Sequence, residues 1–508
     1  MTPSDVKIVL FGPAHSGKST LAGYLYYQSQ PRVAEAQIRK VRAELEQNFD
    51  EAQALAYLVD ISNDERRRTG RLKQGTSKRL HVSRFEILHR ANVTFHTLDT
   101  PGAEHGANQR YSGILFSDAG IYCVEAAQIF EIMAADNPKT ALSSSLSHVL
   151  SWSIIRPGAP LVIALTKMDN TEWDTKRLDD FSLLASEIFK IEDVVPISID
   201  VRNRVDLNIK GRRESSRPCL FDVAEKLSQK LIKAPEQLSG TMPFVFVGSR
   251  AQEDRGVGHR ILGKVMSGGI RVAETIVIYQ RSSPSGISAR IKKLAESPEL
   301  HPGVEELHAG DLGAISIAEP VEHVSGTLIC RESMVVRCGT ILNIASHELS
   351  QSWRAIGRNI SLLHLGASFK ARIVDLQRLP VDESFSGEHR DRWTLTVVLR
   401  ADYVWMPITE GHGMLNLNTV MLSFDETGQS YDVGGTIAAC GRRARFQFRD
   451  QDFAKDASEA IKRSDKDLVD LDQLEVGSEG IEYLLGVWAH RSAQQSKGIA
   501  PLEISICG

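Results

Sequence analysis

The sequence contains Gly12-Pro13-Ala14-His15-Ser16-Gly17-Lys18-Ser19, a match to the phosphate-binding pattern GxxxxGK(S/T), and Thr20 follows it directly. The apolar residues 6–12 before it predict a buried strand, and a helix is expected from about Lys18. In this setting, the backbone N–H groups of the loop and the N-terminus of the helix bind phosphates. We expect Lys18 to reach the β- and γ-phosphates and the Ser19 hydroxyl to bind Mg²⁺.

The segments around this loop predict an α/β P-loop domain, which we place at residues 1–236. Helical patterns alternate with further apolar strands, a pattern typical of a mainly parallel sheet with helices on both faces. The expected strands are Val93–Leu98, Gly120–Val124, Leu161–Leu165 and Val194–Ile199. Residues 33–60 predict one long amphipathic surface helix.

The second half of the chain has a different pattern. Lys233–Pro243 has the composition of a linker, and short alternating strands with Gly and Pro turns follow it. This pattern predicts two β-barrels, which we place at residues 243–346 and 347–508. The second barrel is expected to carry a C-terminal extension, whose position the sequence does not define.

A second motif, Asp99-Thr100-Pro101-Gly102, ends the strand at Val93–Leu98. An aspartate at the end of a strand in a P-loop domain is expected to contact Mg²⁺, and the Gly102 N–H is expected to meet the γ-phosphate. The motif predicts a switch that senses the nucleotide.

A third motif, Thr166-Lys167-Met168-Asp169, ends the strand at Leu161–Leu165. The Asp169 carboxylate can accept two hydrogen bonds from the N1 and N2 edge of guanine. Adenine cannot supply them, so this residue is expected to select the base. The backbone at Ser198 and Ile199, after the next strand, is expected near guanine O6.

The order and spacing of these elements resemble the translational GTPases, most closely the elongation factor Tu and elongation factor one alpha branch. The sequence is similar beyond the motifs, as in HSGKSTLAGYLYY, TKMDNTEWDTKRLDDF and RGVGHRILGKVMSGGIRVAETIVIY. The resemblance covers residues 6–235, continues through Pro243–Asn343 and is faint beyond Leu365. It implies a GTP-binding domain with two β-barrels, GTP or GDP and Mg²⁺ as ligands, and GTPase activity.

The chain departs from this family after Gly102. The family has a histidine there that positions the attacking water, but here the residue is Ala103, and the nearest histidine is His105. Three alternatives are open: His105 replaces the missing catalytic group from a shifted loop, hydrolysis is slow, or a partner supplies the group. We expect slow or partner-dependent hydrolysis, because positioning provides most of the catalysis in this reaction.

Two further departures concern the first switch and the base site. The first-switch threonine that binds Mg²⁺ in the family corresponds here to Thr69, or to Thr76 or Ser77, and we favour the later pair with Thr76 as ligand. Thr166 stands where the family has asparagine, and we expect weaker nucleotide affinity at most.

Three functions therefore compete. The first is a divergent translation factor that acts with the ribosome and tRNA or with a protein factor. The second is a GTP-dependent regulator that does not act on the ribosome, and the third is the GTPase subunit of sulfate adenylylation. Ribosome stimulation of hydrolysis distinguishes the first from the others.

The composition indicates which partners and which cellular compartment to expect. The formal net charge is −4 and the pI about 6.5, so no overall positive field favours DNA, and we expect no DNA partner. The 6 cysteines lack metal-ligand spacing, which indicates a reducing compartment. We find no signal sequence and no apolar run of about 18 residues, so we expect a cytoplasmic protein without a membrane partner.

Overall fold

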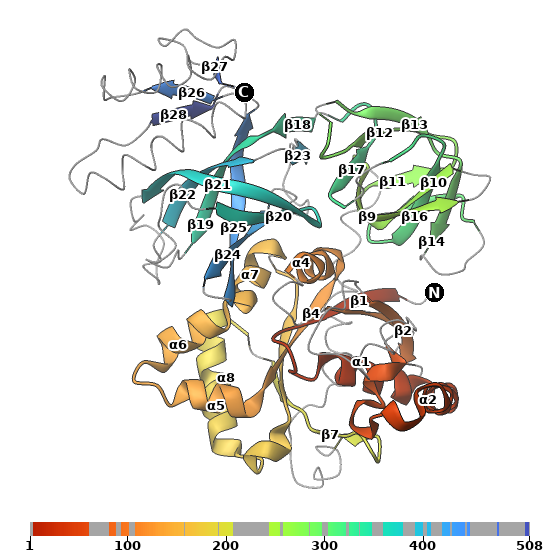
Figure 1. Cartoon of the computed structure of the whole chain (residues 1–508), viewed down its shortest axis with the longest axis vertical. Helices are drawn as coiled ribbons and strands as arrows, with labels where there is room; N and C mark the ends of the chain where they lie inside the picture. Colours follow the sequence, from red (N-terminus) through yellow and green to blue (C-terminus); the bar gives the residue numbers. More distant parts are fainter. Residues whose placement is uncertain are drawn as a thin grey trace. The chain divides into compact units, whose positions relative to one another are not determined.

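The computed structural model divides into two compact units, Met1–Gln237 and Leu238–Gly508, which are drawn in Figure 1. The predicted Thr69, Thr76 and Ser77 lie outside the residues that the structure describes, as do Gly102, Ala103 and His105. These predictions therefore stay predictions. The described residues are 4–59, 81–87, 93–100, 107–156, 158–191, 193–206, 243–254, 258–283, 285–296, 303–321, 325–334, 336–347, 359–378, 392–399, 404–407, 419–426, 429–441, 444–447, 475–476 and 503–506.

The first unit is built on a six-stranded sheet of order β2-β3-β1-β4-β5-β6. The pairs from β3 to β6 are parallel, and only β2 runs antiparallel to its neighbour β3. This arrangement confirms the predicted mainly parallel sheet. The strands are β1 (Ser4–Phe11), β2 (His81–Ile87), β3 (Val93–Asp99), β4 (Ala119–Glu125), β5 (Leu161–Thr166) and β6 (Val194–Pro196), and a separate hairpin joins β7 (Ile199–Asp200) to β8 (Val205–Asp206).

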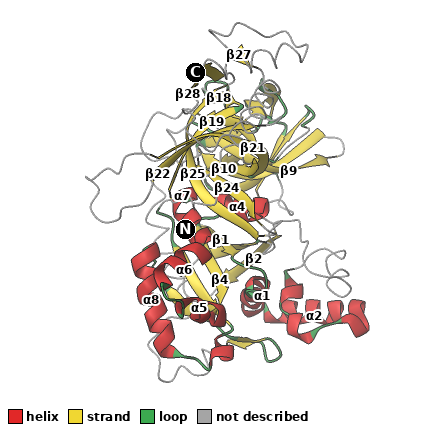
Figure 2. Cartoon of the chain, turned by 60° about the vertical axis from the view of Figure 1, so that its left-hand side comes forward, coloured by secondary structure: helices red, strands yellow, loops and turns green. Residues whose placement is uncertain are grey.

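Helices cover both faces of this sheet, as Figure 2 shows. Successive residues of a strand point to opposite faces. Leu10 of β1 packs with Leu21 and Leu25 of α1, whereas Phe11 stacks on Trp152 of α7 with ring centroids 5.6 Å apart. The helices are α1 (Lys18–Ser29), α2 (Pro31–Leu45), α4 (Ala107–Phe116), α5 (Ala126–Met133), α6 (Pro138–Ser145), α7 (Ser147–Ile155) and α8 (Thr175–Phe189), and the 3₁₀ turn η5 (Met168–Thr171) precedes α8.

The prediction of one helix over residues 33–60 is wrong for the second half of this range. Helix α2 ends at Leu45, because the backbone of Glu46 has a φ of 46° and a ψ of −114°. The chain continues through three 3₁₀ turns, and the Asp50 carboxylate starts the second of them by accepting a hydrogen bond from the Ala52 N–H at 2.9 Å. The turns are η1 (Glu46–Asn48), η2 (Glu51–Gln53) and η3 (Ala56–Leu58).

The second unit begins with a seven-stranded sheet of order β13-β12-β17-β9-β10-β16-β14. Its neighbours pair antiparallel, and its inner face buries a cluster that includes Phe246, Ile261 and Ile315. The strands are β9 (Val245–Asp254), β10 (Gly258–Ser267), β12 (Thr275–Tyr279), β13 (Ile287–Arg290), β14 (Lys293–Glu296), β16 (Leu312–Ile317) and β17 (Thr327–Cys330), with β11 (Gly269–Arg271) paired to β15 (Glu306–His308).

A closed barrel of order β19-β22-β21-β20-β24-β25 follows. The predicted succession of an α/β domain and β domains is confirmed, and the described residues form one closed barrel, so the predicted second barrel stays a prediction. The predicted limit between residues 346 and 347 falls inside β19 of this barrel. The barrel strands are β19 (Ile341–His347), β20 (Asn359–His364), β21 (Ala367–Arg378), β22 (Arg392–Leu399), β24 (Thr419–Glu426) and β25 (Gln429–Gly441). Outside the barrel, β18 (Val336–Gly339) pairs with β23 (Val404–Pro407), and β26 (Ala444–Gln447) pairs with both β27 (Glu475–Val476) and β28 (Glu503–Ile506).

None of the helices in the described part of the chain has the length and apolar character that a bilayer crossing requires.

Candidate functional site

The predicted phosphate-binding loop joins β1 to α1. Gly12 leaves the strand with a φ of 140°, and a Cβ there would lie 2.1 Å from the Cys123 carbonyl oxygen of β4. Gly17, the N-cap of α1, has a φ of 83°, and His15 has a φ of 62°. At Gly12 any residue with a Cβ atom would clash with the Cys123 carbonyl, so this position requires glycine. A loop curled in this way before a helix N-terminus fits a bound phosphate.

The side chain of Lys18 lies within this loop. Lys18 is buried, and its ammonium donates hydrogen bonds to the Pro13 carbonyl and, at 3.3 Å, to the Ser16 hydroxyl. Ser19 and Thr20, the next residues of α1, are half-buried. The loop therefore holds a fixed positive charge next to a hydroxyl, a combination that suits a phosphate with its Mg²⁺.

Thr166, at the end of β5, joins the base motif to the phosphate loop. Its hydroxyl oxygen lies 2.8 Å from the Ser16 carbonyl and 3.1 Å from the Val124 carbonyl of β4. A hydroxyl has one proton, so the two carbonyls share it. Thr166 thus links the two loops from the position where the family has asparagine.

Replacing Thr166 with alanine is expected to weaken GDP binding by about ten-fold, because two buried carbonyls lose their shared donor. Thr166→Ser keeps the hydroxyl and is expected to bind GDP within about two-fold of the wild type. Titration with a fluorescent GDP analogue measures both variants. Wild-type affinity in Thr166→Ala would show that the loops hold their places without this hydrogen bond.

The base motif continues with two charged side chains. Lys167 has a φ of 55°, and its ammonium pairs with the Glu125 carboxylate at 2.7 Å. The Asp169 carboxylate is exposed and accepts a hydrogen bond from the hydroxyl of Ser198, which is buried. The Ser198 side chain therefore fixes the orientation of the group predicted to read guanine. The sequence predicted a role only for the backbone at Ser198, and neither the Lys167–Glu125 nor the Ser198–Asp169 contact was predicted.

The second motif begins beside the phosphate loop. Asp99 is the last residue of β3 and pairs with Leu10 of β1. Thr100 donates to the Leu10 carbonyl from its N–H at 3.2 Å and from its hydroxyl at 2.8 Å. These bonds hold the start of the second motif against Leu10, which lies two residues before Gly12 in the chain.

The predicted site residues within the described part of the chain therefore meet at one edge of the sheet. The phosphate loop, Asp99, Thr166–Asp169 and Ser198 all follow the carboxyl ends of parallel strands, and Ile199 begins β7 next to them. That edge is where open α/β sheets bind ligands. Gly102, His105 and Thr76 lie outside the described residues, so the structure places neither the predicted catalytic histidine nor the switch threonine.

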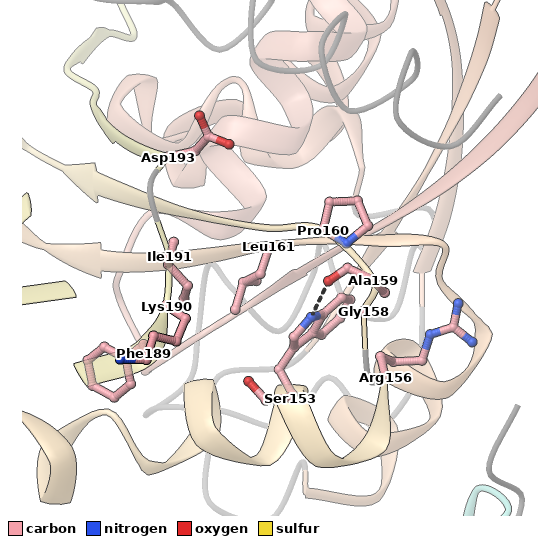
Figure 3. Close-up of a pocket in the computed structure, with 11 residues that line it drawn as sticks. Ser153, Arg156, Gly158, Ala159, Pro160, Leu161, Phe189, Lys190, Ile191 and Asp193 are labelled. Carbon is pink, nitrogen blue, oxygen red and sulfur yellow. Dashed lines mark hydrogen bonds between the residues drawn. The ribbon is translucent and has the colours of Figure 1, made fainter. Parts of the chain in front are cut away.

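A cavity of about 410 Å³ lies at the opposite end of the sheet (Figure 3). Its wall includes Leu161, the first residue of β5, whereas Thr166 is the last. Trp152 of α7 also lines the cavity and donates from its indole N–H to the Ala159 carbonyl at 3.1 Å. The cavity is therefore separate from the predicted nucleotide site.

Comparison with known proteins identifies the first domain. The family model of the elongation factor Tu GTP binding domain matches residues 4–252. The first domain is therefore similar to the GTP-binding domain of the translational elongation factors, at low sequence identity. Elongation factor 1-alpha of Nanoarchaeum equitans is 22% identical over 314 residues, which cover 60% of this chain and 65% of that protein. Elongation factor 1-alpha of Methanosarcina barkeri is 24% identical over 305 residues, covering 59% and 66%. The chain thus spans slightly less than two thirds of the length of these relatives.

Solved structures share the fold of this chain over more of its length. The S. cerevisiae Ski7 GTPase-like domain bound to GTP has a TM-score of 0.65 at 17% identity, covering 86% of this chain and 98% of that one. The elongation factor SelB of Methanococcus maripaludis, in complex with the GTP analogue GppNHp, has a TM-score of 0.55 at 13% identity, covering 89% and 85%.

Proposed function

We propose that this protein is an elongation-factor-like molecular switch that binds GTP and GDP with Mg²⁺ and hydrolyses GTP slowly without a partner. The observation that carries the proposal is the link from Ser16 through the Thr166 hydroxyl to the base motif. The same motif orients Asp169 through Ser198. A phosphate loop and a base-reading carboxylate held in one hydrogen-bonded frame suit a guanine nucleotide.

Each residue then has a role in binding. The loop from Gly12 to Thr20 surrounds the phosphates, Lys18 neutralises the β- and γ-phosphates, and Ser19 with Asp99 and Thr76 holds Mg²⁺. The Gly102 N–H meets the γ-phosphate. Asp169 selects guanine, while Thr166, Lys167, Ser198 and Ile199 complete the base site. Mg²⁺ neutralises charge on the β- and γ-phosphates when it is bound.

Slow hydrolysis follows from Ala103, which cannot orient a water molecule as the family's histidine does. Under the favoured proposal a ribosome, acting with tRNA or a protein factor, supplies or positions the missing group. Ala103 also favours a second candidate, a cytoplasmic regulator that senses GTP and does not act on the ribosome. His105 is the candidate catalytic residue if the chain supplies the group itself.

The test is GTP turnover by the purified protein with and without ribosomes. We expect basal turnover on the order of 10⁻⁴ per second, the level of a GTPase without its activating partner, and stimulation of at least about 100-fold by ribosomes. GTP binding without stimulation would contradict the ribosomal proposal and support the regulator. If His105→Ala removes the stimulated turnover while GTP binding persists, His105 is the catalytic group.

A further inference from the structure

A small hairpin begins directly after Ser198. Its strands β7 and β8 have two residues each, and a two-stranded hairpin of this size is not stable alone. The Asp200 carboxylate organises its turn by accepting from the N–H groups of Arg202 and Asn203 at 3.1 and 3.0 Å. The place of the hairpin, and of Ser198 before it, therefore depends on contacts with the rest of the domain.

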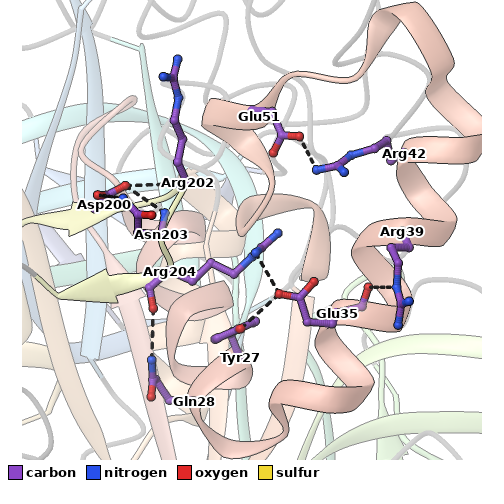
Figure 4. Close-up of polar contacts among 10 residues, drawn as sticks. All are labelled: Tyr27, Gln28, Glu35, Arg39, Arg42, Glu51, Asp200, Arg202, Asn203 and Arg204. Atoms are coloured by element: carbon purple, nitrogen blue, oxygen red, sulfur yellow. Dashed lines mark hydrogen bonds and ion pairs between the residues drawn. The ribbon is translucent and has the colours of Figure 1, made fainter.

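Arg204, at the end of this turn, makes the polar contacts to the neighbouring helices (Figure 4). Its guanidinium lies 2.8 Å from the Glu35 carboxylate of α2 and 5.6 Å from the centre of the Tyr27 ring of α1. The Tyr27 hydroxyl donates to the same Glu35 oxygen at 3.1 Å. The Arg204 carbonyl accepts from the Gln28 side chain at 3.4 Å. One residue of the hairpin is thus joined to both helices.

The environment makes these contacts stronger than ordinary surface pairs. The side chains of Arg204 and Glu35 are only 18% and 33% exposed, and partial desolvation strengthens charge-assisted hydrogen bonds. Burial, followed by the hydrogen bond to Glu35, raises the pKa of Tyr27 above its usual value, in agreement with its hydroxyl acting as a donor.

Arg204 also has a φ of 54°, a left-handed conformation that is unfavourable for a residue other than glycine. Such strain persists only where surrounding contacts compensate for it. The contacts with Glu35, Tyr27 and Gln28 provide that compensation.

Apolar contacts connect the same elements. Ile199 and Val201 of the hairpin pack against a buried cluster from α1, α2 and the 3₁₀ segment, which includes Tyr24, Ile38 and Leu55. Helix α1 starts at the phosphate loop, and the 3₁₀ segment leads to residue 59, after which the candidate first-switch residues follow. The hairpin therefore lies in one packed group with elements that reach the phosphate loop and the start of the switch region.

We propose that Arg204 is a positioning residue of the guanine site. Its contacts with Glu35, Tyr27 and Gln28 hold the hairpin against α1 and α2, and the hairpin holds Ser198 where it orients Asp169. Arg204 thereby slows the release of bound guanine nucleotide without contacting it. The inference rests on the guanine-nucleotide binding proposed above.

The matched test compares Arg204→Ala with Arg202→Ala. Arg202 belongs to the same turn, is exposed, and points away from α1 and α2 in Figure 4. Release of a fluorescent GDP analogue is followed after addition of excess GDP. We expect release about five-fold faster in Arg204→Ala and within about 1.5-fold of the wild type in Arg202→Ala.

A double-mutant cycle separates positioning from a general loss of stability. Glu35→Gln is expected to speed release about three-fold, and adding it to Arg204→Ala is expected to change the rate by less than about 1.5-fold, because the two residues act through one contact. Thermal unfolding of the nucleotide-free variants serves as the stability readout, and we expect every variant to be fully folded at the temperature of the release measurement.

The possible outcomes are distinct. Wild-type GDP binding with unchanged release in Arg204→Ala overturns this inference alone. The inference is also overturned if the double variant releases GDP at a rate raised by the product of the two single effects, because Arg204 and Glu35 would then act independently. A wild-type protein that binds no GDP overturns the proposed function and this inference together.

Discussion

Replacing Lys18 with alanine is expected to lower the affinity for GTP and GDP by about 100-fold or more. The Lys18 ammonium is buried in the phosphate loop, where it bonds the Pro13 carbonyl and the Ser16 hydroxyl. A charge-assisted hydrogen bond to a phosphate contributes about 1.5–3 kcal/mol, and the lysine is expected to make two of them. The phosphates would also lose the positive charge that compensates their own.

Calorimetric titration with GDP and GTP in the presence of Mg²⁺ measures this loss. Lys139→Ala is the control, because it removes the same charge from an exposed ion pair with Glu187 on the surface of the same domain. The control is expected to bind both nucleotides as the wild type does. Unchanged GTP affinity in Lys18→Ala would mean that the phosphates bind elsewhere.

Replacing Asp169 with asparagine is expected to exchange the preferred base from guanine to xanthine. The carboxylate accepts from guanine N1–H and from the guanine amino group, but an asparagine amide offers one acceptor and one donor group. Xanthine has a carbonyl where guanine has the amino group, so it matches the amide. A mismatched polar pair costs about 2–4 kcal/mol, which corresponds to roughly 30- to 1000-fold in affinity.

The structure makes this substitution informative. The Ser198 hydroxyl donates to an Asp169 oxygen, and an asparagine carbonyl oxygen can accept the same bond. The loop is therefore expected to keep its shape while its base preference changes. Asp180→Asn, on an exposed position of α8, is the control for the loss of a carboxylate and is expected to retain guanine specificity.

The sequence predicted the nucleotide-binding edge of the fold because its motifs sit on strong local signals. A run of buried residues before Gly12, and another before Thr166, predicts strands whose carboxyl ends share one edge. The left-handed backbone at Gly12 and Gly17 likewise agrees with the glycine pattern. Local pattern was therefore enough to place the phosphate loop and the base motif together.

Contacts between residues distant in the chain were not predictable in the same way. Gln28 and Arg204 are 176 positions apart, and their hydrogen bond exists only because the hairpin packs on α1 and α2. No sequence signal marks Glu125, which meets Lys167 only because β4 and β5 are neighbouring strands of the sheet. The apolar spacing of residues 33–60 fits a helix, but the backbone at Glu46 ends the helix, and Leu55 and Leu58 are buried from the turns that follow it.

The base-exchange experiment tests the central claim most directly. The affinities of the wild type and of Asp169→Asn are measured for GDP and for xanthosine diphosphate, in the same buffer with Mg²⁺. We predict that the wild type binds GDP at least about 30-fold more tightly than xanthosine diphosphate, and that the variant reverses this order. A variant that keeps the preference of the wild type for GDP would contradict the assignment of the guanine site.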